Sequence, residues 1–157
     1  MSVTIRQNRR DKNLMIRVER LAEQSRHGIR QGFYRLGNDL VKEARRSIIR
    51  GPKSGRLYRV PGRSRRHRAS APGQPPATLS GALQRTIDFQ ITGSDSMEFG
   101  SRPQPGNAFQ KRTKDYAKHL ELGTNKMQAR PYLKPAVRKI NRNGRKHFEA
   151  ELARAHS

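Results

Sequence analysis

The chain has 157 residues, with 35 Lys and Arg against 12 Asp and Glu and a formal net charge of +23. Hydrophobic residues make up only 32%, below the roughly 45–50% of typical globular domains. This composition argues against a large core and favours a small one, either with long solvated arms or completed by partner subunits. The absence of cysteine excludes disulfides and thiol chemistry, and no apolar run approaches the roughly 18 residues of a membrane span. Such a charge favours polyanionic partners, most simply nucleic acid.

A long helix is the first element expected. From Leu14 to Ile48, apolar residues follow one another at steps of three or four, which is the period of one helical face. Gly28 and Gly32 each weaken a helix by about 1 kcal/mol relative to alanine. We therefore expect a kink or break near residues 27–32.

A basic loop rich in Pro and Gly is expected next, over residues 50–78, because this composition excludes a helix or a central strand. Arginine binds phosphate through a bidentate fork, so the loop is predicted to contact DNA or another polyanion. Tyr58 lies inside the run and offers a ring that can stack on a base. The alternative is a solvated loop whose charge only aids solubility. Residues 50–68 contain no acid and eight basic residues, which are Arg50, Lys53, Arg56, Arg59, Arg63, Arg65, Arg66 and Arg68.

A hairpin and a second helix complete the expected elements. Residues 87–91 alternate apolar and polar side chains, residues 93–96 have the composition of a turn, and residues 97–99 resume the alternation. Apolar residues recur at helical spacing over residues 133–152, and Pro135 suits the first turn of that helix. The pattern predicts an α+β fold, in which a small antiparallel sheet packs against the long N-terminal helix.

We expect a single domain over residues 1–157, with an N-terminal arm over residues 1–13. Within this arm, Val3 and Ile5 offer an edge strand. The five histidines are scattered and lack metal-site spacing, and the acids of the predicted hairpin fit a solvated face. The sequence therefore predicts no enzyme, no catalytic residue, no metal site and no cofactor.

Three motifs in the second half of the chain are more specific. The first is Ala-Pro-Gly-x-Pro-Pro-Ala over residues 71–77, followed by Gly-x-Leu at residues 81–83 and by Thr86-Ile87. The second is Tyr-Ala-x-x-Leu-Glu-x-Gly-Thr over residues 116–124, and the third is Ala-Arg-Pro-Tyr-Leu-x-Pro-Ala over residues 129–136. In this order they resemble the head–tail joining family of tailed bacteriophages, which are also called neck, tail-completion or minor tail proteins. The residues that carry the resemblance include Pro72, Gly73, Pro75, Pro76, Gly81, Leu83, Tyr116, Leu120, Glu121, Gly123, Thr124, Arg130, Pro131, Leu133 and Pro135.

The resemblance implies a structural virion protein of the neck or tail, made in the host cytoplasm, with no catalytic residues. It implies a ring of copies of this chain, commonly six-fold, next to the tail terminator and the head-closure or connector proteins. In that setting the basic loop would contact double-stranded DNA in the channel or acidic neighbouring subunits, with no membrane and no small-molecule substrate. The alternative, from charge alone, is a free nucleic-acid-binding protein without sequence specificity.

Overall fold

A computed structural model describes residues 9–62, 64–102 and 116–156 of the chain. The fold is α+β, as predicted, and residues 116–122 form a further short helical segment. The edge strand expected at Val3 and Ile5 lies outside the described residues. In chain order the elements are α1 (Arg9–Arg50), β1 (Leu57–Arg59), β2 (Arg66–Arg68), α2 (Ala82–Thr86), β3 (Ile87–Ile91), β4 (Met97–Ser101) and α4 (Leu133–His156).

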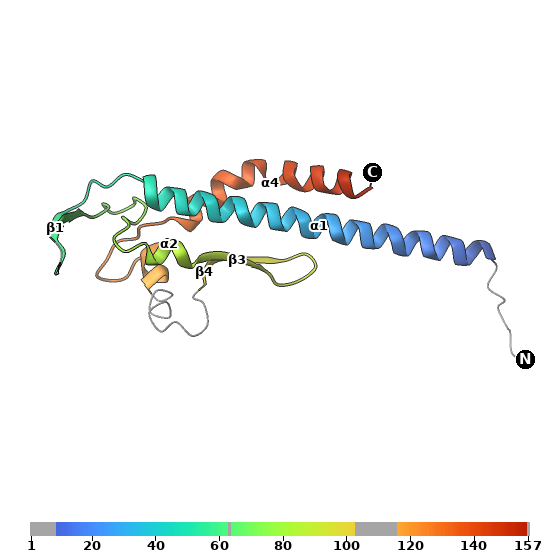
Figure 1. Cartoon of the computed structure of the whole chain (residues 1–157), viewed down its shortest axis with the longest axis horizontal. Coiled ribbons are helices and arrows are strands. Elements are labelled where there is room, and N and C mark those ends of the chain that lie inside the picture. Colours follow the sequence, from blue (N-terminus) through green and yellow to red (C-terminus); the bar gives the residue numbers. More distant parts are fainter. Residues whose placement is uncertain (1–8, 63, 103–115, 157) are drawn as a thin grey trace, which may run out of the picture.

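Helix α1 is one continuous rod of 42 residues, about 63 Å long at the helical rise of about 1.5 Å per residue (Figure 1). It begins at Arg9, inside the segment expected as an N-terminal arm. The expected kink near residues 27–32 is not present in the helix. The glycines there serve close packing instead: a Cβ on Gly32 would lie 2.7 Å from the ring of Phe148, and one on Gly28 would lie 3.0 Å from the Cβ of Ala155.

Helix α4 runs antiparallel to α1 along one side of it (Figure 1). The rings of Phe33 and Phe148 meet edge to face, with centroids 5.0 Å apart. An ion pair between Arg35 and Glu151 joins the same two helices, and its nitrogen and oxygen atoms lie 2.9 Å apart. Along the interface the residue numbers rise in α1 and fall in α4, as expected for antiparallel helices. The contacts pair Gly28 with Ala155, Gly32 with Phe148, Leu36 with Gly144 and Glu43 with Lys139.

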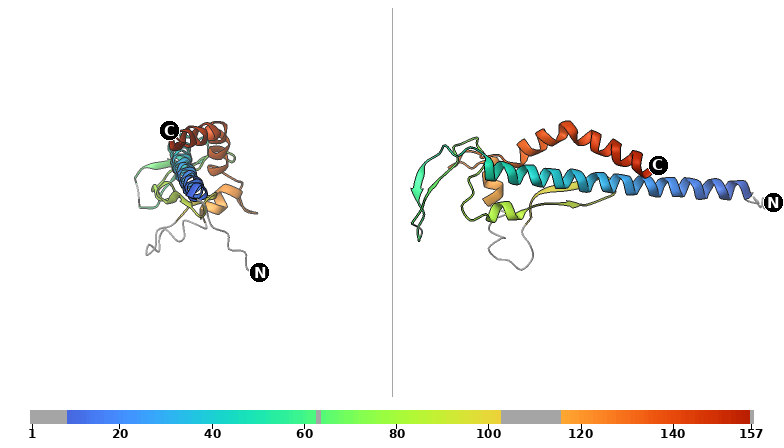
Figure 2. Two further views of the ribbon diagram at one scale, coloured as in Figure 1. Left: turned by 90° about the vertical axis from the view of Figure 1, so that its right-hand side faces the viewer. Right: turned by 45° about the horizontal axis from the view of Figure 1, so that its top comes forward.

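The predicted hairpin is confirmed, and it packs against α1 on a different side from α4 (Figure 2). Strands β3 and β4 pair antiparallel, with Phe89 opposite Phe99. The ring of Phe89 meets that of Tyr34 edge to face, with centroids 6.0 Å apart. A Cβ on Gly37 would overlap the Phe89 ring, so this glycine sets the depth at which the hairpin packs.

The core lies at the C-terminal half of α1, where α2, β3, the helical segment 116–122 and the start of α4 contribute buried residues. Arg45 fixes this meeting point, since its guanidinium donates to the carbonyl of Gln84 at 3.0 Å and to that of Ile87 at 2.8 Å. The small core agrees with the low apolar content of the chain. Its buried members are Val41, Ala44, Ile48, Leu83, Ile87, Ala117, Leu120, Tyr132 and Ala136.

Replacing Gly37 with alanine tests the packing of the hairpin on α1. Alanine favours the helix by about 1 kcal/mol, but the added methyl group overpacks the Phe89 contact, which typically costs about 1–3 kcal/mol. We expect Gly37→Ala to lower the free energy of unfolding measured by urea denaturation. The control Asn38→Ala, at an exposed neighbouring site, should raise it slightly, and equal stabilisation by both changes would contradict this packing.

A candidate polyanion-binding ribbon and its anchor

The expected basic loop contains a two-stranded antiparallel ribbon, formed by β1 and β2. Leu57 pairs with Arg68, and Arg59 pairs with Arg66. Backbone hydrogen bonds extend this pairing to the root, where the amide of Gly55 donates to the carbonyl of Ala69 at 2.9 Å. The ribbon extends beyond the end of α1 (Figure 1). Both strands are edges, which is consistent with the exclusion of a central strand.

Seven of the eight predicted basic residues lie in the described part of the chain, and all seven are exposed. Arg63 lies outside the described residues. Lys53 donates to the carbonyl of Ile49 at 3.3 Å, and Arg68 donates to that of Gly55 at 3.4 Å. Among the described residues, none of the seven forms an ion pair. Their charges are therefore open to an external anion.

The ribbon carries its arginines on one face. Arg59 and Arg66 stand directly opposite each other, an arrangement of like charges that destabilises a strand pair. On the other face, the rings of Tyr58 and His67 meet edge to face, with centroids 5.5 Å apart. A bound polyanion would relieve the repulsion between the arginines. Two-stranded ribbons also fit the width of the major groove of DNA.

The first motif fastens the root of the ribbon. The side-chain carbonyl of Gln74 accepts from the amides of Ser54, at 3.2 Å, and Ala71, at 3.0 Å, and its amide nitrogen donates to the Ser54 hydroxyl at 2.7 Å. The amide of Gly73 donates to the carbonyl of Ala129 at 2.9 Å, which joins the first motif to the third. Sequence reasoning passed over Gln74 because it stands at a variable position of the motif. Its isolated polar amide among Pro and Gly was the available signal.

Arg130 joins the second and third motifs to the ribbon. Its amide donates to the carbonyl of Leu120 at 2.6 Å, and its guanidinium donates to the carbonyl of Ser70 at 3.3 Å. Ser70 directly follows the backbone pairing of the ribbon root. Arg130 thus connects the ribbon to the helical segment 116–122, of which Ala117 and Leu120 are buried.

Glu121 links the second motif to the start of α4. Its carboxylate accepts the backbone amides of Tyr132 at 2.8 Å, Leu133 at 3.0 Å and Lys134 at 2.8 Å. The next residue, Pro135, has no amide hydrogen to satisfy. The carboxylate therefore caps the helix and places negative charge at its N-terminus, which the helix dipole favours. Burial, together with the charge of Glu121, raises the pKa of the Tyr132 hydroxyl.

Gly123 and Thr124 close the turn between the second and third motifs. Gly123 has a φ of 78°, and a Cβ there would lie 2.9 Å from the Met127 carbonyl oxygen. The Thr124 hydroxyl accepts the amide of Met127 at 3.1 Å. The other motif residues divide by burial. Pro76, Gly81, Leu83 and Leu120 are buried, Pro75, Pro131 and Leu133 are half-buried, and Pro72, Tyr116 and Pro135 are exposed.

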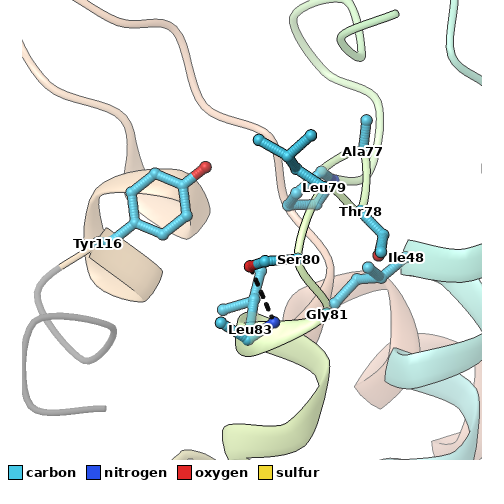
Figure 3. Close-up of a pocket in the computed structure, with 10 residues that line it drawn as sticks. Ile48, Ala77, Thr78, Leu79, Ser80, Gly81, Leu83 and Tyr116 are labelled. Atoms are coloured by element: carbon cyan, nitrogen blue, oxygen red, sulfur yellow. Dashed lines mark hydrogen bonds between the residues drawn. The ribbon is translucent and has the colours of Figure 1, made fainter. Parts of the chain in front are cut away.

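A pocket of about 320 Å³ opens beside the first motif (Figure 3). Tyr116, from the helical segment 116–122, stands on one side of it and faces Leu79 and Leu83 across the space. Partial burial raises the pKa of the Tyr116 hydroxyl, and the positive charge of Arg130 partly opposes this shift. The sequence predicted Tyr116 and Leu83 as motif residues but not the pocket between them.

Two further properties of the described residues bear on other kinds of site. These residues contain no group of three or more His, Cys, Asp or Glu side chains placed to hold a metal ion. No helix among them combines the length and the apolar content needed to cross a membrane. In comparisons with known proteins, no family model, curated protein or solved structure matches the chain.

Replacing Glu121 with alanine tests the cap of α4. The change leaves three backbone amides without their acceptor, and we expect it to lower the free energy of unfolding by about 2–4 kcal/mol. Urea denaturation followed by circular dichroism measures this loss. The control is Glu149→Ala, which removes an exposed carboxylate paired with Arg145 at 2.7 Å and should cost less than about 1 kcal/mol. Similar losses for both variants would contradict the capping role.

Replacing three ribbon arginines with glutamine tests polyanion binding. Each phosphate contact adds about 0.9 to the slope of log affinity against log salt. The triple change Arg59→Gln, Arg66→Gln and Arg68→Gln should therefore weaken duplex DNA binding and reduce that slope by up to about three units. The control Lys134→Gln, Arg138→Gln and Lys146→Gln removes the same charge from exposed positions of α4. Equal effects of the two triple changes would show that net charge, not the ribbon, governs binding.

Proposed function

We propose that this chain is a structural, non-enzymatic subunit of the neck or tail of a tailed bacteriophage. In this role several copies form a ring at the junction of head and tail, in contact with tail-terminator and head-closure proteins. The ribbon of β1 and β2 contacts the DNA in the channel or an acidic surface of a neighbouring subunit. The mature protein resides in the virion after synthesis in the host cytoplasm.

The observation that carries this proposal is the joining of the three motifs at the root of the ribbon. Gly73 bonds to Ala129, and Arg130 bonds to both Leu120 and Ser70. The residues that give the chain its resemblance to neck proteins thus hold a basic, acid-free projection in place. A thin core with exposed apolar side chains, among them Leu79 at 41% and Leu122 at 67%, also fits a subunit that neighbours complete.

A free nucleic-acid-binding protein is the second candidate, and it is favoured by the exposed arginines of the ribbon, which form no ion pair with a described residue. Such a protein would bind any duplex as a monomer, with a steep dependence on salt. The neck subunit would instead assemble into a ring or bind isolated tails or head connectors. Sedimentation of the protein with and without DNA separates the two, because only the neck subunit forms a closed oligomer without nucleic acid.

Electron microscopy of phage particles made with and without the protein tests the proposal. We expect filled heads and separate tails to accumulate when the protein is absent, and joined particles to return when it is supplied. Supplying the triple variant Arg59→Gln, Arg66→Gln and Arg68→Gln should restore joining less well than supplying the α4 control variant. Normal infectious particles in the absence of the protein would overturn the neck assignment.

A further inference from the structure

Two exposed tyrosines, Tyr58 and Tyr116, lie close together at the end of the molecule that carries the ribbon (Figure 1). Tyr58 is 39% exposed and Tyr116 is 53% exposed. Burial raises the pKa of the Tyr116 hydroxyl, Arg130 lowers it, and Tyr58 adds a smaller rise, so the last two side chains both lie near that hydroxyl. Neither tyrosine belongs to the buried core. Large apolar surface left exposed in one place marks a site of interaction.

A pocket adjoins Tyr116 and has room for a small planar ligand. Its volume of about 320 Å³ lies at the small end of the range for ligand pockets, about 300–1,000 Å³. The exposed Leu79 and the buried Leu83 stand across the space from Tyr116 (Figure 3). Thr78 and Ser80 also line the pocket and offer hydroxyls, and the described residues that line it include no acid. The pocket can therefore hold one heteroaromatic ring, with apolar side chains for its faces and hydroxyls for its edges.

Positive charge surrounds the pocket and the two tyrosines. The Arg85 guanidinium donates to the carbonyl of Ser80 at 3.1 Å, at the rim of the pocket, and Arg130 lies near Tyr116. Neither arginine forms an ion pair with a described residue. Glu121, the acid in the helical segment of Tyr116, is occupied by three backbone amides at the start of α4, and the ribbon contains no acid. Exposed rings among arginines favour a ligand that combines aromatic rings with negative charge.

We infer that this surface binds single-stranded nucleic acid, with one unpaired base in the pocket against Tyr116 and a neighbouring base against Tyr58. The arginines of the ribbon and of the pocket rim contact the phosphates of the strand. A duplex keeps its bases stacked inside and presents only its backbone and the edges of its base pairs, so it cannot fill the pocket. Contact with a ring accepts any base, since every base has an aromatic face. The inference rests on the proposed function only in taking nucleic acid as the polyanion, and it adds the unpaired base as a ligand.

Fluorescence anisotropy of a labelled oligonucleotide tests this site in the full chain. Tyr58→Leu and Tyr116→Leu each remove a ring but keep an apolar side chain, and each should weaken binding of a single strand about fivefold or more. Tyr116→Phe should restore the affinity, because it restores the ring. The control Tyr34→Leu makes the same change at a site of similar exposure, 41%, which contacts Phe89 of the hairpin, and should change single-strand affinity less than about twofold. Binding of a duplex of the same sequence should be unchanged in all these variants.

An abasic strand of the same length separates contact with bases from contact with phosphates. It keeps the phosphate charge, so the arginines still bind it, but Tyr58→Leu and Tyr116→Leu should not weaken its binding. A nucleoside monophosphate should bind about a hundredfold more weakly than the normal strand or worse, because it offers the arginines one phosphate. Equal losses for the normal and the abasic strand would overturn the contact with bases. Equal affinity for the free nucleotide and the strand would overturn the strand as the ligand.

The outcomes separate this inference from the proposed function. If the tyrosine variants keep full single-strand affinity while the ribbon triple variant loses duplex binding, the base site is overturned and the contact with duplex DNA stands. If Tyr116→Leu loses self-association but keeps single-strand binding, a second copy covers the pocket, which overturns the base site and leaves the ring standing. Strand binding that requires both tyrosines, together with normal phage particles that lack the protein, would support the base site and overturn the neck role alone.

Discussion

The carboxylate of Glu121 is the interaction on which the arrangement of the second half of the chain depends. It accepts three successive backbone amides at the start of α4, while its own backbone continues the segment that buries Ala117 and Leu120. One charged side chain therefore satisfies the end of α4 and ties that end to the core. Beside a core this small, an uncapped helix end would cost a large part of the domain's marginal free energy of unfolding.

From its capped N-terminus, α4 packs along α1, and the two helices approach most closely at glycines of α1. Gly28 and Gly32 let the two helices approach until the ring of Phe148 and the methyl group of Ala155 lie against the backbone of α1. Glycine costs helix stability in isolation, so its presence at these two positions is explained by packing. Gly37 has the same role toward the hairpin. The three glycines together determine how closely α1 is covered on two of its sides.

The sequence could predict the elements whose signals are local. Helical spacing gave α1 and α4, and alternation gave β3 and β4, because periodicity reports which side chains share a face. It could not predict what packs opposite Gly32, since Phe148 is far away along the chain, and glycine read alone suggests a kink. The pairing of Arg59 with Arg66 was also hidden, because like charges and nearby Pro and Gly argue against a strand pair. The pocket facing Tyr116 likewise depends on tertiary contacts.

The distribution of charge bears on the proposed assembly. Within the described chain, exposed acids that form no ion pair stand near the start of α1, at Glu19 and Glu23, and on the hairpin, at Asp88 and Asp95, whereas the ribbon at the other end has none. Arg17, Arg20 and Arg26 surround the two acids of α1, so that end is not acidic overall. A strongly basic subunit repels its own copies, and a ring of copies must therefore keep most of the positive charge away from the contacts between subunits or set it against a polyanion. The acid-free ribbon extends beyond the end of α1 (Figure 1), so it can bring positive charge to a polyanion while other surfaces of the chain serve assembly.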